Sequence, residues 1–154
     1  MSTASFQVDT NQIPDANILK FGIVISSWNG NITDNLLKGC LDLLYSKKVP
    51  KANIQIMNVP GSFELIYGCK MMQQKQVDVV IAIGSIIKGE TKHFEFICNA
   101  ISNGIKDLNI NGGCPVIFCV LTDDTLEQSI DRSGGKYGNK GSEAAIAAIK
   151  MALI

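Results

Sequence analysis

The sequence predicts an α/β fold in which helices cover both faces of a central parallel sheet. Apolar runs of strand length alternate with longer helical patterns along the chain. Residues 77–87 are apolar at nearly every position, which is typical of a central parallel strand covered on both faces. Strands and helices that alternate in this way form right-handed βαβ units. The 154 residues match the size of one domain, and neither a repeat nor a linker interrupts them.

Four elements are expected in the first half of the chain. Residues 21–26 form an apolar run of strand length. Residues 32–47 predict a helix, because five apolar side chains recur on one of its faces. A second strand at 54–59 is stopped by a Pro–Gly pair, and a second helix at 63–74 follows it.

The second half continues the alternation. After the central strand at 77–87, apolar residues recur at helical spacing over 94–108. A fourth strand is expected at 115–121. The next helix, 125–133, opens with a threonine and a glutamine three residues later, which is a capping-box pattern. A last helix is expected at 142–153.

Composition excludes several classes of function. Basic and acidic residues balance at 14 each without a basic stripe, which argues against a nucleic-acid partner. The longest apolar run is too short to span a membrane, and the N-terminus lacks the apolar segment of a signal peptide. The five cysteines are dispersed, which argues against a disulfide framework or a metal site. We therefore expect a cytoplasmic protein, and its 18% charged residues suggest a subunit interface.

The predicted topology places a ligand site before any motif is considered. In open parallel sheets, ligands bind outside the carboxyl ends of the strands. That rule gathers residues 27–31, 59–64, 86–93 and 121–125 around one crevice.

The segment after the central strand has the features of an anion site. Free N–H groups at the start of a helix attract anions, Gly89 permits a close approach, and Thr91 offers a hydroxyl. Glu90 stands where a nucleotide P-loop requires lysine, so nucleotide hydrolysis is rejected. His93, the only histidine, can transfer protons near neutral pH. An ordinary capped helix start and a surface histidine are the alternative interpretations.

Three further residues suit a ligand, each with a structural alternative. Arg132, the only arginine, has a planar fork that suits phosphate, although positive charge also stabilises a helix C-terminus. Trp28 could stack on a planar heterocycle or pack in the core. Glu64 could accept hydrogen bonds from ligand hydroxyls or stabilise a helix N-terminus.

The motifs that contain these residues resemble the 6,7-dimethyl-8-ribityllumazine synthase family. They occur in order and at compatible spacing between about residues 21 and 152: Phe21 followed by Trp28–Asn29, Val-Pro-Gly-Ser-Phe-Glu at 59–64, the run at 84–94, Pro-Val-Ile-Phe-Cys-Val-Leu-Thr at 115–122, and the run at 127–141. The resemblance implies a flavodoxin-like three-layer α/β/α sandwich that is oligomeric. It also implies one domain over residues 1–154, with residues 1–14 as an N-terminal arm.

The family's reaction is the penultimate step of riboflavin biosynthesis. 5-Amino-6-(D-ribitylamino)uracil condenses with 3,4-dihydroxy-2-butanone 4-phosphate to give 6,7-dimethyl-8-ribityllumazine, phosphate and water. The resemblance implies neither a cofactor nor a metal.

Carried over by position, the resemblance assigns roles to individual residues. His93 would transfer protons. The phosphate would be held by Gly89, Glu90, Thr91 and Arg132, with Glu90 contributing its backbone N–H while Lys88 and Lys92 offset its charge. The other substrate would contact Trp28, Asn29, Ser62, Phe63, Glu64, Ile86, Ile87, Phe118 and Lys140.

The resemblance also implies partners. Active sites would lie between neighbouring subunits of a homopentamer, and Lys140 would act across that boundary. The compact connection at 134–141 resembles members that pack twelve pentamers into a 60-subunit shell. An association with riboflavin synthase is a further expectation. The segment Phe6-Gln7-Val8 could add an edge strand to a neighbour's sheet.

Three positions depart from the family pattern. Trp28 replaces a frequent phenylalanine, Glu90 a small residue, and Cys119 a glycine beside Phe118, which would alter the aromatic wall. Two other functions stay open from the sequence: a flavin or lumazine carrier without turnover, and a purely structural shell protein. Retention of both His93 and Arg132 disfavours each of them.

Overall fold

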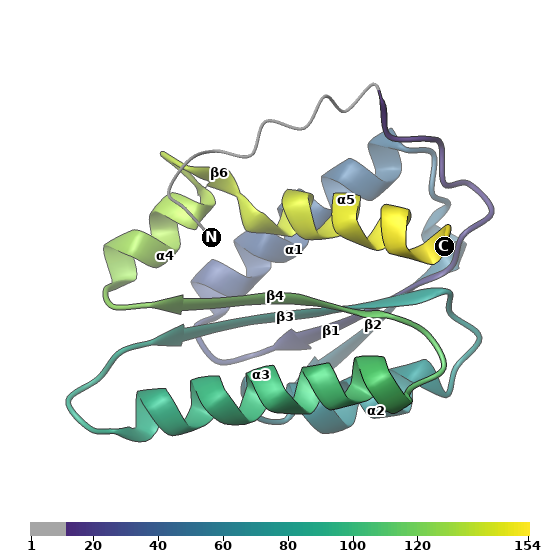
Figure 1. Ribbon diagram of the computed structural model, residues 1–154. Helices are drawn as coiled ribbons and strands as arrows, with labels where there is room; N and C mark the ends of the chain where they lie inside the picture. The colour runs from purple at the N-terminus through teal and green to yellow at the C-terminus, as the bar shows by residue number, and fades with distance from the viewer. Residues whose placement is uncertain (1–11) are drawn as a thin grey trace.

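The computed structural model describes residues 12–154 and contains a four-stranded parallel sheet (Figure 1). Its strands, in the order β2-β1-β3-β4, are β2 (Ile54–Val59), β1 (Phe21–Ser26), β3 (Val79–Ile87) and β4 (Val116–Asp123). Each neighbouring pair is parallel. The fold class predicted from the alternation is confirmed.

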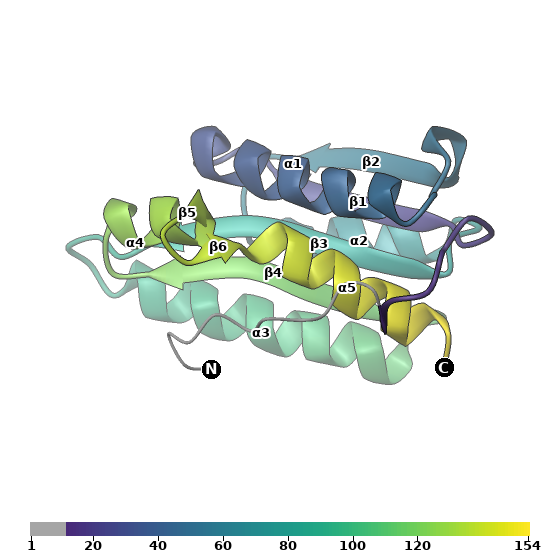
Figure 2. The same cartoon turned by 90° about the horizontal axis from the view of Figure 1, so that it is seen from above.

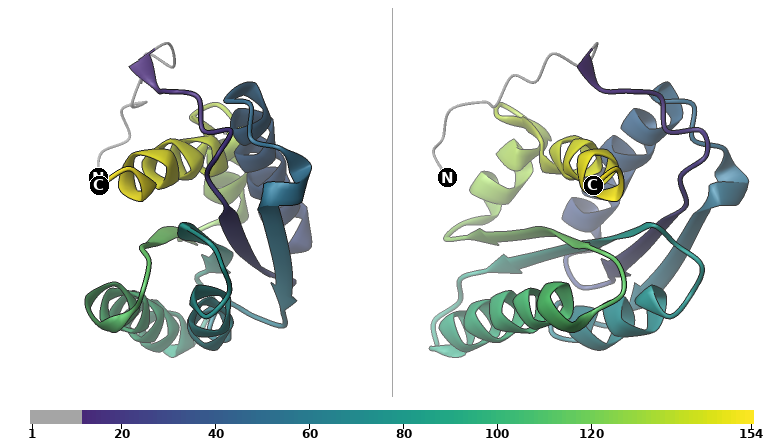
Figure 3. Two further views of the ribbon diagram at one scale, coloured as in Figure 1. Left: turned by 90° about the vertical axis from the view of Figure 1, so that its right-hand side faces the viewer. Right: turned by 45° about the vertical axis from the view of Figure 1, so that its right-hand side comes forward.

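Helices form a layer on each face of this sheet. In Figure 1, α1 (Gly30–Ser46) and α5 (Lys140–Ala152) lie above the strands, with α4 (Leu126–Arg132) beside them. The helices α2 (Leu65–Gln73) and α3 (His93–Asn111) lie below. Figure 2 shows α5 and α1 lying over the sheet, and Figure 3 shows both helix layers. A short 3₁₀ turn, η2 (Lys51–Asn53), leads into β2.

Side-chain alternation along the strands separates the core into two halves. On β1, Phe21, Ile23 and Ile25 pack in the cluster beneath α1 and α5. Val24 points the other way, into the cluster that holds Leu65 and other residues of α2 and α3. Because successive side chains of a strand point to opposite faces, one apolar strand supplies both halves.

The helix ends agree with the predicted signals, with small shifts. The Thr125 hydroxyl accepts a 3.3 Å hydrogen bond from the backbone N–H of Gln128, as the capping box predicts. The Gln128 side chain, however, accepts from the N–H of Asp124 at 2.9 Å, one residue earlier than that motif requires.

A short β-hairpin precedes α5. The sequence had predicted only a compact, glycine-rich connection there. Its strands are β5 (Ser133–Gly135) and β6 (Gly138–Asn139). The Asn139 side chain accepts a 2.8 Å bond from the N–H of Gly141 and donates to the carbonyls of Asn35 at 2.8 Å and Ser133 at 3.2 Å. This cap starts α5 at Lys140, two residues before the predicted start.

The sequence predicted an N-terminal edge strand and the absence of a membrane-spanning segment. The proposed edge strand at Phe6-Gln7-Val8 lies outside the described residues. Across residues 12–154, the structure contains no helix with the length and apolar character needed to cross a membrane.

Asn109 joins α3 to the outer edge of β4. Its amide donates to the carbonyl of Val116 and accepts from the N–H of the same residue, both at 2.9 Å. It also donates to the Ile105 carbonyl at 3.0 Å. Because Val116 is buried, Asn109→Ala leaves two backbone groups unpaired, and we expect the free energy of unfolding to fall by about 1–3 kcal/mol in urea titrations.

Asn103→Ala is the matched control for that measurement. Asn103 lies on the same helix and donates only within it, to the carbonyl of Asn99 at 2.9 Å. Its loss should change the free energy of unfolding by less than about 0.5 kcal/mol. Equal effects of the two substitutions would contradict the role given to Asn109.

Candidate active site

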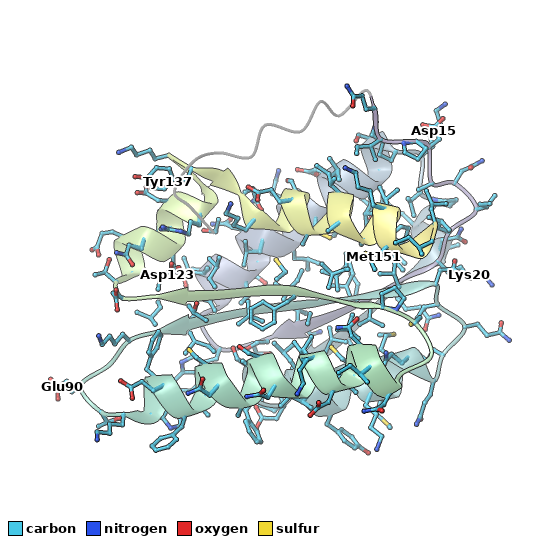
Figure 4. All side chains as sticks on the ribbon, in the orientation of Figure 1. Asp15, Lys20, Glu90, Asp123, Tyr137 and Met151 are labelled. Atoms are coloured by element: carbon cyan, nitrogen blue, oxygen red, sulfur yellow. The ribbon has the colours of Figure 1, made fainter. Side chains whose placement is uncertain are left out.

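The carboxyl ends of the strands meet at one end of the molecule. In Figure 4, Glu90 after β3 and Asp123 at the end of β4 lie at this end, and Tyr137 lies above them beside the hairpin. Asp15 and Lys20 lie at the opposite end. The predicted crevice segments therefore lie along one edge of the sheet.

The turn after β1 carries an exposed aromatic ring and is hydrogen-bonded to the two neighbouring strands. Trp28 is 71% exposed. Asn29 follows it in the left-handed region, at φ 57° and ψ 46°, and its side-chain amide donates to the Ser85 carbonyl of β3 at 3.0 Å. The N–H of Ser27 donates to the Val59 carbonyl at 2.8 Å. The turn that carries Trp28 is thus bonded to both neighbouring strands.

The exit of β2 places two exposed side chains at the start of α2. Phe63 is 51% exposed, and Glu64 is exposed beside it as the residue before the helix. Ser62 is buried, and its hydroxyl has no hydrogen-bond partner among the described residues. A Cβ atom at Gly84 would lie 2.9 Å from that hydroxyl, so glycine permits this loop to lie against β3.

The exit of β3 contains the loop that was expected to bind an anion. Ile86 and Ile87 are half-buried at the strand end, and residues 88–92 are exposed. A Cβ atom at Gly89 would meet open space, so the backbone there is accessible to a ligand. Helix α3 begins at His93, whose N–H donates to the Thr91 hydroxyl at 3.4 Å. His93 is exposed in the first turn of this helix.

The charges around this loop differ from the expectation. Lys88 was expected to offset the charge of Glu90, but its ammonium lies 3.5 Å from a carboxylate oxygen of Asp124. Both side chains of this pair are more than half exposed, so the pair contributes little to stability. Glu90 projects outward at the tip of the loop (Figure 4).

Arg132 lies at the end of α4, on the other face of the sheet from α3 (Figure 1). Its Nε atom is 3.7 Å from an oxygen of Asp123, and one Nη atom donates to the Gln128 carbonyl at 3.0 Å. Its guanidinium carbon lies 5.4 Å from the centroid of the Tyr137 ring. Within one chain, therefore, Arg132 and His93 lie on different faces of the sheet.

Phe118 and Cys119 point to opposite faces of β4. Phe118 is 41% exposed on the face that Val116 and Val120 share, toward α3. Cys119 is buried in the cluster beneath α1 and α5, and its thiol lies 3.6 Å from the Lys140 carbonyl. Burial raises the pKa of the Cys119 thiol to about 12. The expectation that Cys119 alters the wall beside Phe118 is therefore wrong, because alternation turns it into the core.

Lys140 opens α5 with its ammonium bonded to both carboxylate oxygens of Glu143, at 2.8 and 2.9 Å. Both side chains are about one third exposed. Lys140 thus belongs with Arg132 to the α1/α5 side of the sheet.

The structure divides the predicted site residues into two sets. The first set lies at the exits of β1, β2 and β3 and includes Trp28, Asn29, Ser62, Phe63, Glu64, Ile86, Ile87, Gly89, Glu90, Thr91 and His93. The second set, Phe118, Arg132 and Lys140, lies on β4, α4 and α5.

Neither Asp123 nor its contact with Arg132 was predicted from the sequence. The available signal was an acidic residue directly after an apolar run, which marks a strand end. Within residues 12–154, no three histidine, cysteine, aspartate or glutamate side chains are grouped to hold a metal ion.

The chain is similar in sequence to known proteins over nearly its whole length. The family model described as 6,7-dimethyl-8-ribityllumazine synthase matches residues 18–154. A protein of that name from Christiangramia forsetii is 59% identical over 148 residues, which are 95% of this chain and 88% of the relative. A Flavobacterium johnsoniae protein of that name is 58% identical over 96% of this chain and 78% of its own. Since both matches cover nearly the whole chain, the protein belongs to the 6,7-dimethyl-8-ribityllumazine synthase family.

Proposed function

We propose that this chain condenses 5-amino-6-(D-ribitylamino)uracil with 3,4-dihydroxy-2-butanone 4-phosphate. The products are 6,7-dimethyl-8-ribityllumazine, phosphate and water, and the activity is that of a transferase in the penultimate step of riboflavin biosynthesis. The observation that carries the proposal is the exposed loop with accessible backbone at Gly89, which leads directly into His93 at the start of α3. A phosphorylated substrate bound there lies beside a proton-transfer group.

Within the first set, the residues at the exits of β1 and β2 and at the end of β3 suit the ribitylaminouracil. The exposed ring of Trp28 offers a stacking surface for the pyrimidine, with Asn29 beside it. Glu64 accepts hydrogen bonds from the ribityl hydroxyls, next to Ser62 and Phe63. The backbone of Ile86 and Ile87 at the end of β3 contacts the heterocycle.

The phosphorylated substrate is bound by the loop after β3. The phosphate accepts hydrogen bonds from the backbone of Gly89 and Glu90 and from the Thr91 hydroxyl. His93 then transfers protons as the carbon–nitrogen bonds form and phosphate leaves. Because the bound substrates are already aligned, much of the acceleration comes from positioning.

A neighbouring subunit supplies the second set. Arg132 and Lys140 lie on the opposite face of the sheet from α3, and Phe118 is exposed on the edge strand β4. This separation supports a site shared between two copies, in which Arg132 of one subunit meets the phosphate of the next. Phe118 then completes the aromatic wall around the heterocycle, and Lys140 approaches from the same side.

The shared site accords with a homopentamer. Large apolar side chains stay exposed on the α2/α3 side, among them Tyr67 at 67%, Phe96 at 68% and Ile110 at 70%. The compact hairpin β5–β6 supports the 60-subunit shell of twelve pentamers, which is cytoplasmic and associates with riboflavin synthase.

Purified protein mixed with both substrates should yield the lumazine chromophore and one phosphate per turnover. Absorbance and a phosphate assay measure the two products in the same sample. Production at the uncatalysed rate, combined with tight binding of the lumazine, would instead indicate a carrier without turnover.

His93→Ala should lower kcat by about a hundredfold while turnover continues, because proton transfer is lost but alignment remains. Steady-state kinetics with both substrates measures the change. Glu95→Ala, an exposed residue in the same helical turn, is the control and should retain the parent rate. A His93→Ala enzyme as fast as the parent would exclude His93 from proton transfer.

Light scattering of the purified protein separates the two assemblies. Five chains of 16.6 kDa give about 83 kDa, and sixty give about 1,000 kDa. We expect the larger mass. A stable particle near 83 kDa would restrict the assembly to the pentamer, and a 16.6 kDa monomer with full activity would contradict the shared site.

A further inference from the structure

We propose that Asp123 is a positioning residue that orients the Arg132 guanidinium for the substrate phosphate. The inference rests on the proposed function, because it concerns the arginine assigned to that phosphate. Asp123 is the last residue of β4 and is only 7% exposed. A carboxylate buried to this degree requires partners for its charge.

Both oxygens of the Asp123 carboxylate have a partner. One accepts a 2.8 Å hydrogen bond from the Ser129 hydroxyl, which is itself fully buried on α4. The other lies 3.7 Å from the Nε atom of Arg132. The hydroxyl of Ser129 fixes the rotation of the carboxylate, so that its second oxygen faces the guanidinium.

The contacts of Arg132 leave its outer nitrogens able to bind an anion. Asp123 lies beside Nε, and the Gln128 carbonyl accepts from one Nη atom at 3.0 Å. The Tyr137 ring lies against the guanidinium carbon at 5.4 Å. The side chain is still 23% exposed, and its other N–H groups belong to the two Nη atoms, the pair that binds phosphate in a bidentate manner.

Asp123 is a rigid anchor because its backbone is part of the sheet. It pairs with Ile87 in the β3–β4 ladder, and its carbonyl accepts a 3.0 Å hydrogen bond from the N–H of Lys88. An arginine held by this residue therefore has a position defined relative to the strand ends. A flexible arginine side chain loses conformational entropy when it binds a ligand. Because Asp123 already restricts the rotamers of Arg132, less entropy is lost when the phosphate binds.

Charge alone predicts the opposite result from positioning. A carboxylate close to a phosphate site repels the anion, so removing its charge should strengthen phosphate binding. If Asp123 instead holds Arg132 in place, removing that charge should weaken binding. The sign of the change in affinity thus decides between the two effects.

The test is Asp123→Asn, which keeps the shape of the side chain and an acceptor for Ser129. We expect KM for the phosphorylated substrate and the inhibition constant for inorganic phosphate to rise about tenfold, the size of one lost charge-assisted contact. KM for the ribitylaminouracil should stay within about twofold. Asp131→Asn is the matched control, because it removes the same charge next to Arg132 in the sequence and should leave both phosphate constants unchanged or lower.

Arg132→Ala completes a double-mutant cycle. That substitution should itself raise KM for the phosphorylated substrate, and adding Asp123→Asn to it should change nothing further, because Asp123 acts through the arginine. If Asp123 only stabilised the packing of β4 and α4, Asp123→Asn would weaken phosphate binding both in the parent and in the Arg132→Ala variant. Ser129→Ala, which leaves the charge in place but frees the carboxylate, should raise the phosphate constants in the same direction by a smaller factor.

The outcomes separate this proposal from the function on which it rests. A parent protein that forms no lumazine contradicts the function, whatever the variants do. An active parent whose Asp123→Asn variant folds, assembles and binds inorganic phosphate as tightly as the parent, or more tightly, overturns the positioning role. Circular dichroism and light scattering on each variant establish folding and assembly. If Asp123→Asn does not fold, the inhibition constant of inorganic phosphate is measured on Ser129→Ala instead. A rise supports the positioning role, and an unchanged constant overturns it.

Discussion

The parallel pairing of β1 with both β2 and β3 is the constraint on which the site depends. Three strands that run in one direction must release the chain at the same edge of the sheet, so three separate loops converge there. Hydrogen bonds between these exits then fix the loops. Asn29 reaches the Ser85 carbonyl, and Ser27 reaches that of Val59. The aromatic ring, the acid and the anion loop are therefore held on hydrogen-bonded strand ends.

The side chains of the edge strand β4 alternate between the two faces of the sheet. Cys119 and Leu121 face the core beneath α1 and α5, while Phe118 points to the other face and stays accessible. A single chain thus carries Phe118 on the α2/α3 face of the sheet, whereas Arg132 and Lys140 lie on the α1/α5 side. Under the proposed function, association of copies brings these groups into one site and also covers the exposed apolar side chains.

The sequence predicted the strands well because their signals are local. β1 and β2 have the predicted bounds, and α3 begins at His93, one residue before the predicted apolar pattern. Two features depended on contacts that no local pattern encodes. The hairpin before α5 is set by Asn139, which bonds to Asn35 more than a hundred residues earlier in the chain. Asp123 is significant only through its contact with Arg132, nine residues later and on a different element. The motifs named the candidate site residues, whereas the position of each residue relative to the sheet depends on strand register and side-chain alternation, which the motifs do not encode.

Asn139 also limits how this chain can vary. Its amide group occupies the space above Gly39, where the Cβ atom of any other residue would overlap it, and a Cβ atom at Gly141 would collide with the Leu36 backbone. Gly39 and Asn139 are therefore coupled, because a side chain at residue 39 has room only if Asn139 is replaced as well. Gly141 is restricted separately, by the backbone of Leu36. A designer who rebuilds the hairpin must keep Asn139 matched to Gly39. Among related sequences, substitutions at these two positions should arise jointly.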